Sequence, residues 1–443
     1  MISISTWRRR SRKAGGGRRA GDNHQQPELE VTIPTHFRCP ISLDFMKDPV
    51  TLSTGITYDR ESIESWIESG NYTCPVTNQA LINAEQIPNH TIRKMIQDWC
   101  VKNRSYGIER IPTPRVPVTS IEVMEILSEI MDSTRVNDQS KCRNLVMKIR
   151  NKGKESDRNK KCIKANGAGW TLSAVFKAFA AISFEKFSGL LEEILSALTL
   201  MFPLDREAAS SLASPDSLNC LVRFLNSGDL TSRQNAVLAI KEMLSLGEEH
   251  VDALARIEGA KEAIVKLIKE PICPTSTKAS LMVVYYMVSS FNSRDEIRTE
   301  FADMGLVELL LENLVDTEKS LCEKALGVLD GLCCSEEARE KAYSHALTIP
   351  VIVKKILRVS DMATEFSVSI IWKLCKFEKR DDGGVLVEAL QVGAFQKLLL
   401  LLQVGCCEMT KEKASELLKW LNLNRDKCEC IDSMDFKGIK RSF

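Results

Sequence analysis

The sequence predicts a mostly α-helical protein in which a long stack of helical repeats follows one small α+β domain. Three observations predict this fold class. From about residue 120 to residue 427, apolar residues recur at helical spacing with few strand signals. In that region one helical segment returns about every 44 residues. Residues 34–108 differ, because they combine two short strand-like runs, two amphipathic helices and two Cys-Pro pairs.

The overall composition gives no reason to expect binding to nucleic acid or insertion into a membrane. The 443 residues carry 60 basic and 59 acidic side chains, and 44% are hydrophobic. No apolar run approaches the ~20 residues of a membrane span, and the N-terminal sequence lacks the apolar core of a secretion signal. The 15 cysteines are scattered through apolar helical stretches, which is typical of reduced thiols. We expect a protein of the cytoplasm, the nucleus or both.

Residues 1–33 are predicted to form a disordered basic arm. They contain the cluster Arg8–Arg12 and several glycines but no apolar periodicity. A solvated flexible arm is the favoured interpretation, and a nuclear-import or nucleic-acid patch is the alternative.

Residues 34–108 predict a β-hairpin followed by two helices. The runs 50–52 and 56–58 are the expected strands, and Gly55 supplies the turn. Asp59 and Asn89 are expected to cap the two helices. The predicted apolar faces consist of Ile63, Trp66 and Ile67 in the first helix, and of Ile92, Met95, Ile96 and Trp99 in the second.

Residues 121–427 carry the repeat. A turn residue followed by an apolar helix recurs at steps of 42, 46, 43 and 45 residues, and a second helical landmark recurs at steps of 43, 46, 42 and 47. Because one repeat cannot bury its helices alone, the units must stack, which creates a groove suited to extended partners. The alternative to a binding groove is a solenoid that only supports the N-terminal domain. The first landmark lies at Ser217, Gly259, Gly305, Thr348 and Gly393, and the second at Ala236, Ala279, Ala325, Ser367 and Ala414.

Two further segments complete the chain. Residues 109–120 are rich in proline and are predicted to be an extended linker. Residues 428–443 are predicted to be a flexible tail, because Cys428 and Cys430 lack the two further ligands that a metal site needs nearby.

The segment from Cys39 to Thr77 has the layout of a zinc finger without enough zinc ligands. Such a site needs four Cys or His ligands, but Ser42 stands three residues after Cys39 and the next cysteine is Cys74. We therefore expect a finger with no metal and no cofactor, whose two loops are pinned by hydrogen bonds and ion pairs. The predicted pins are Ser42, Asp48, Asp59, Arg60, Thr77 and Asn89.

Residues 34–108 resemble a U-box, the metal-free relative of the RING finger. The resemblance rests on motifs at fixed spacing: Cys39-Pro40-Ile41, Asp48-Pro49-Val50, Gly55–Arg60, Cys74-Pro75-Val76-Thr77 and Pro88-Asn89. Residues 121–427 resemble degenerate armadillo repeats. This order is similar to that of the plant U-box/armadillo ubiquitin-protein ligases, in particular their stress- and defence-related branch.

The resemblance implies transfer of ubiquitin from a charged ubiquitin-conjugating enzyme to a protein substrate that the armadillo groove recruits. It implies no catalytic nucleophile or base in this chain and no covalent intermediate on it. The implied docking residues for the conjugating enzyme are Ile41, Leu43, Trp66, Pro75, Asn78 and Ala80.

Some of these roles have structural alternatives. For Leu43 we favour docking over a place in the core, because Met46, Val50 and Ile63 can fill a small core without it. For Trp66 the sequence favours neither docking nor a place in the core. Ala80 stands where many U-boxes carry proline, and Asn78 stands where some carry arginine. Both departures bear on the rate and on the choice of conjugating enzyme.

Three other functions compete with this interpretation. The first is a non-enzymatic armadillo scaffold whose U-box has lost productive docking. The second is a thioester-forming ligase, which would need an activated cysteine beside a base, and no such pair is visible. The third is nucleic-acid binding through the arginine arm, which we do not expect.

Overall fold

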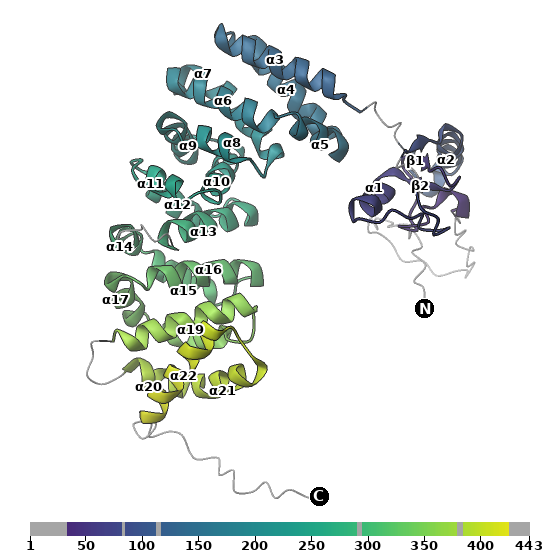
Figure 1. Ribbon diagram of the computed structural model, residues 1–443. Helices are drawn as coiled ribbons and strands as arrows, with labels where there is room; N and C mark the ends of the chain where they lie inside the picture. Colours follow the sequence, from purple (N-terminus) through teal and green to yellow (C-terminus); the bar gives the residue numbers. More distant parts are fainter. Residues whose placement is uncertain (1–32, 82–84, 112–116, 290–294, 379–383, 425–443) are drawn as a thin grey trace, which may run out of the picture. The chain divides into compact units, whose positions relative to one another are not determined.

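The computed structural model describes residues 33–81, 85–111, 117–289, 295–378 and 384–424. The arm predicted for residues 1–33 lies outside these ranges except for Ile33, and the predicted tail at 428–443 lies wholly outside them. The chain divides into two compact units, residues 1–116 and 117–443 (Figure 1).

The first unit is a small sheet with two helices. Its three strands form an antiparallel sheet in the order β2-β1-β3, in which Val50 pairs with both Tyr58 and Pro88. The predicted hairpin is present within one residue, with Gly55 in the left-handed conformation, whereas β3 was not predicted. The elements are η1 (Thr35–Phe37), β1 (Pro49–Thr51), β2 (Thr57–Asp59), α1 (Arg60–Glu68), β3 (Ile87–Pro88), α2 (His90–Lys102) and η2 (Arg104–Tyr106).

The core of this unit lies between the sheet and the two helices. Met46, Val50 and Ile63 are fully buried in it. The side chain of Met95, predicted to lie on the apolar face of α2, is exposed instead. Cys100 takes a buried position on that helix, because the apolar face turns toward residues 96 and 100. Ile111 is also buried in this core, so the first unit extends into the segment predicted to be linker.

The second unit contains helices in sets of three. First helices are α5 (Asp157–Ala165), α8 (Arg206–Leu212), α11 (Glu249–Ala255), α14 (Asp295–Asp303), α17 (Glu336–Ser344) and α20 (Gly384–Gln391). Second helices are α3 (Ser120–Arg135), α6 (Ala168–Ile182), α9 (Pro215–Ser227), α12 (Ala260–Lys269), α15 (Leu306–Leu314), α18 (Thr348–Lys355) and α21 (Ala394–Val404). Third helices are α4 (Gln139–Glu155), α7 (Phe184–Leu198), α10 (Leu230–Leu244), α13 (Pro274–Ser289), α16 (Lys319–Leu332), α19 (Asp361–Lys376) and α22 (Glu408–Leu423), and η3 (Thr199–Met201) follows α7.

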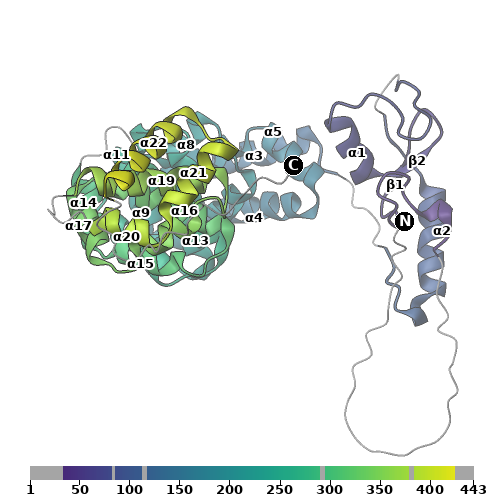
Figure 2. The same ribbon diagram turned by 90° about the horizontal axis from the view of Figure 1, so that it is seen from below.

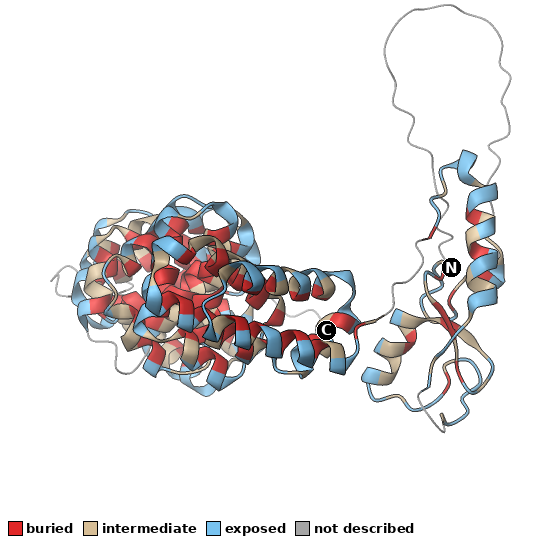
Figure 3. Ribbon diagram, turned by 90° about the horizontal axis from the view of Figure 1, so that it is seen from above, coloured by how far each residue is buried: buried red, intermediate tan, exposed pale blue. Residues whose placement is uncertain are grey.

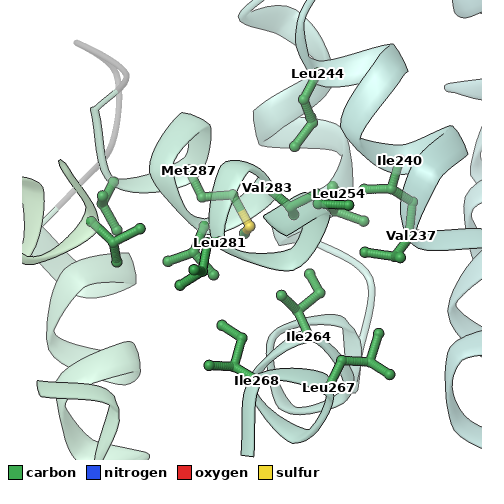
Figure 4. Close-up of a cluster of buried hydrophobic side chains, with 14 of the residues drawn as sticks. Val237, Ile240, Leu244, Leu254, Ile264, Leu267, Ile268, Leu281, Val283 and Met287 are labelled. Carbon is green, nitrogen blue, oxygen red and sulfur yellow. The ribbon is translucent and has the colours of Figure 1, made fainter. Parts of the chain in front are cut away.

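These sets stack into a solenoid with one continuous core. Each third helix packs on the third helix of the next set, from α4 to α22. Figure 2 looks along the stack and shows α14 and α17 on the side away from α13 and α16. Figure 3 shows buried positions concentrated between the layers. In Figure 4 the side chains of Ile240, Ile264 and Met287 converge from α10, α12 and α13, so neighbouring sets share their core.

Both landmarks of the sequence repeat fall on equivalent helices. The first lies at or near the start of a second helix and the second lies within a third helix, from α9 to α22. Gly259, Gly305 and Gly393 precede their helices with φ near +80°, a conformation that glycine adopts without steric cost. Gly167 has the same conformation before α6, which identifies an earlier copy of the repeat.

Among the described residues, no single helix is long and apolar enough to cross a membrane, whereas the pair α20 and α21, bent by 72°, meets the criterion by length and composition alone.

Candidate functional site: two loops of the first unit

The first unit presents two loops with the same backbone geometry, residues 39–44 (the first loop) and 74–79 (the second loop). In the first, the Leu43 amide donates to the Cys39 carbonyl at 2.8 Å; in the second, the Asn78 amide donates to the Cys74 carbonyl at 2.9 Å. Leu43 and Asn78 both have positive φ, at 60° and 57°. Asparagine tolerates this conformation better than leucine does, which gives Asn78 a backbone role beside its predicted docking role.

A buried cysteine sulfur lies at the base of each loop and accepts hydrogen bonds. The Cys39 sulfur accepts from the Asp59 amide at 3.3 Å. The Cys74 sulfur accepts from the Thr54 hydroxyl at 3.4 Å and lies 3.0 Å from the Tyr58 hydroxyl. Each thiol thus joins its loop to β2 or to the hairpin turn. Hydrogen bonds to sulfur therefore do, in this fold, what metal–thiolate bonds do in a zinc finger.

Two carboxylates hold the segment that leaves the first loop. Asp59 accepts hydrogen bonds from the amides of Lys47 and Asp48, both at 2.8 Å. Asp48 in turn pairs with Arg60 at 2.7 Å and with Arg93. Since Arg60 begins α1 and Arg93 lies on α2, one carboxylate connects both helices to the loop. Burial raises the pKa of the Asp59 carboxyl, against the effect of its two amide donors.

The predicted cap at Asp59 is wrong in one respect. Asp59 does occupy the residue before α1, but its side chain makes no capping hydrogen bond. Its carboxylate is engaged by the Lys47 and Asp48 amides instead. The local sequence could not reveal this choice, because the competing donors lie 11 and 12 residues away.

The other predicted pins lie in different settings. Asn89 caps α2 by accepting from the Ile92 amide at 2.9 Å, as predicted, and its amide donates to the hydroxyls of Thr51 and Thr57. Ser42 accepts from the Asp44 amide within its own loop, and Thr77 hydrogen-bonds the Cys74 sulfur. Asn89 therefore joins separate elements, whereas Ser42 and Thr77 act inside their loops.

The predicted docking residues differ in exposure. Leu43 is 61% exposed, whereas Ile41 is half-buried and packs against the core. Trp66 also packs partly against the core, and its indole N–H donates to the Thr73 carbonyl at 2.9 Å, which ties α1 to the start of the second loop. Pro75 is half-buried, and Asn78 and Ala80 are exposed.

Several candidate functional residues were not predicted from the sequence. Val76 occupies the same place in the second loop as Ile41 does in the first, and its side chain is exposed, which makes it a docking candidate. The loop repeat Cys-Pro-x-Ser/Thr was a signal that could have found it. Arg93, Thr54 and Tyr58 were not recognised as pins, because their partners are distant in sequence.

The Cys74 thiol should make the stability of the first unit depend on pH. Burial alone would raise its pKa, but hydrogen bonds from Thr54, Thr77 and Tyr58 outweigh this and lower the pKa to about 6. Because this value lies below that of the unfolded thiol, near 9, the contribution is full above pH 9 and is lost as the pH falls toward 6.

We therefore expect the unfolding free energy of the first unit to rise between pH 6 and 9, and we expect Cys74→Ser to make this rise smaller. Urea unfolding at four pH values measures both. Cys100→Ser, at another buried thiol of the same core, is the matched control. If the unfolding free energy depended on pH equally in the two variants, Cys74 would not be the source of the pH dependence.

Comparison with known proteins agrees with this geometry over nearly the whole chain. The family described as "U-box domain" matches residues 33–105, and the one described as "Plant U-box protein ARM repeat region" matches residues 122–440. The chain belongs to the plant U-box/armadillo-repeat family. The U-box and the armadillo-like solenoid predicted from the sequence are thereby confirmed.

Several curated relatives cover almost the whole U-box/armadillo chain. U-box domain-containing proteins 21 and 20 of Arabidopsis thaliana are 50% and 47% identical, each over 94% of this chain and over 95% and 94% of their own lengths. E3 ubiquitin-protein ligase PUB23 of the same plant is 34% identical over 88% of this chain and 93% of its own.

Solved structures show the likeness of the fold alone. The structure described as "A conserved phosphorylation switch controls the interaction between cadherin and beta-catenin in vitro and in vivo" matches with a TM-score of 0.51 and 17% identity. The match covers 68% of this chain and 55% of that chain.

Proposed function

We propose that this protein is a ubiquitin-protein ligase that docks a ubiquitin-charged conjugating enzyme on the two U-box loops and recruits a protein substrate through its armadillo repeats. The class of activity, RING-type (U-box) ubiquitin transfer, follows from the family. The observation that carries the docking proposal is the pair of matching loops with exposed apolar side chains, Leu43 and Val76. Apolar anchors on a rigid frame are typical of interface hot spots.

The proposed chemistry acts by positioning. A substrate amine attacks the thioester carbon of ubiquitin, the C–N bond forms, the C–S bond breaks and the conjugating enzyme recovers its thiol. Cys39 and Cys74 are fully buried structural thiols, so they are unsuited to receive ubiquitin. Holding the thioester in a reactive geometry lowers the barrier without a covalent step on this chain.

The row of third helices is the proposed recruitment surface. These helices pack on one another along the whole solenoid, and several of their polar side chains pair between neighbours, such as Lys373 with Asp330 at 2.8 Å. A surface of this kind is long and continuous enough to accept an extended segment of a substrate.

A self-ubiquitination assay with a broad panel of conjugating enzymes tests the proposal. We expect ubiquitin chains with at least one of them. No chains with any of them, from a folded protein, would favour the alternative, a non-enzymatic scaffold with an unproductive U-box.

We further propose a cytoplasmic role in plant stress or defence signalling, supported by the resemblance of the Cys-Pro-Ile opening to that branch of the family. A fluorescent fusion followed before and after stress or elicitor treatment tests the location. An unchanged stress response in plants that lack the protein would contradict the role.

A further inference from the structure

The last described second helix, α21, presents an apolar face to solvent. Leu399, Leu400 and Val404 are 43%, 49% and 69% exposed. Leu400 and Val404 lie four residues apart on one side of the helix, and Leu399 lies next to Leu400 along the chain. Exposed apolar patches of this kind generally mark a surface that another element covers.

Equivalent positions in the preceding repeats show that this face is specific to the last one. The position of Leu399 is buried in the three preceding second helices, where it is Val265, Val353 and Leu311. The position of Leu400 is exposed but charged in those helices, where it is Lys266, Lys354 and Glu312. In α21, Leu399 is exposed where its equivalents are buried, and Leu400 is apolar where its equivalents are charged. Both changes indicate that α21 is built to be covered.

We infer that residues 425–443 of the same chain cover this face as the C-terminal cap of the solenoid. The segment follows directly on α22, which ends at Leu423 and packs against α21 in the same repeat. The repeat family also matches this chain through residue 440, well past that helix. The segment carries apolar residues that can face α21, namely Ile431, Met434, Phe436, Ile439 and Phe443.

The length and composition of this segment fit a cap better than they fit a separate partner. Nineteen residues extend to about 28 Å even as one helix, which is long enough to cross a neighbouring helix. Asp432, Ser433, Asp435 and Lys437 alternate with the apolar residues, and a terminal repeat needs a polar outer surface of that kind. Covalent attachment also gives the segment an effective concentration in the millimolar range, above that of a free partner or a second copy.

Hydrogen exchange of the full chain compared with a chain ending at Asn424 tests the inference. We expect the α21 amides to exchange at least tenfold faster in the shortened chain, while the amides of α9, the second helix four sets earlier in the stack, are unchanged. In the full chain, Phe436→Asp combined with Ile439→Asp should reproduce the effect. Ser433→Asp combined with Ser442→Asp, in the same segment, is the control and should not.

The outcomes decide between occupants. Equal α21 exchange in the full and shortened chains overturns the cap. Protection that depends on protein concentration also overturns it, because a second copy would then cover the face. If the shortened chain does not fold, the full chain with Phe436→Asp and Ile439→Asp still tests the cap. Unchanged α21 exchange in that variant would overturn it. None of these results bears on ubiquitin transfer, so the ligase proposal stands or falls separately.

Discussion

Replacing Asp48 with alanine is expected to destabilise the U-box by about 2–3 kcal/mol and to abolish docking of the conjugating enzyme. The change leaves the Arg60 and Arg93 guanidiniums without their shared carboxylate, and their side chains are only 16% and 11% exposed. Breaking a fully buried pair costs about 3–5 kcal/mol, and the partial exposure here reduces that figure. The loss would remove much of the stability of so small a unit.

Amide exchange in β1 and β2 of the full chain measures this effect. At 1.4 kcal/mol per factor of ten, the expected acceleration is about 30- to 150-fold. Asp98→Ala is the matched control, because it removes the same charge from an exposed position on α2. If the β1 and β2 amides were as protected from exchange in the Asp48 variant as in the Asp98 variant, the ion pairs of Asp48 with Arg60 and Arg93 would not be what holds the loops.

Replacing Leu43 with alanine should reduce ubiquitin discharge from the conjugating enzyme by about 5- to 150-fold while leaving the fold intact. Truncating a central apolar anchor costs about 1–3 kcal/mol of binding, whereas an exposed side chain contributes about 0.5 kcal/mol or less to stability. Single-turnover discharge of the charged enzyme measures the first effect, and urea unfolding measures the second.

Two further variants separate the Leu43 side chain from its backbone. Leu43→Gly relieves the positive φ and should be at least as stable, but equally inactive. Val101→Ala removes an equally exposed apolar side chain from α2 and should keep full activity. Discharge by Leu43→Ala within twofold of the unchanged protein would remove Leu43 from the docking surface.

The fold was largely predictable because it repeats. A period near 44 residues, marked independently by a turn and by a small residue, leaves few architectures other than a helical solenoid. The strand β3 escaped prediction, since it is two residues long and contains a proline, both of which argue against a strand. Met95 was misplaced because helical spacing fixes a face only to within about one residue.

The site was predictable as residue types but not as partners. Asp48, Asp59 and Asn89 could be named as pins because a finger without metal needs polar contacts. Their partners could not, since Asp48 and Arg93 are 45 residues apart, and Asp59 caps no helix but holds the Lys47 amide. The role of the two sulfurs as hydrogen-bond acceptors could be recognised only in the folded structure. For Cys74 it depends on the Tyr58 and Thr54 hydroxyls, which are distant in sequence, lying within hydrogen-bonding distance of the sulfur.

The most direct test of the metal-free docking platform is the discharge of ubiquitin from a charged conjugating enzyme by protein stripped with a strong zinc chelator. If hydrogen bonds and the ion pairs of Asp48 hold the loops, the stripped protein should stimulate discharge as fast as the untreated protein does. A loss of stimulation that added zinc restores would contradict the account.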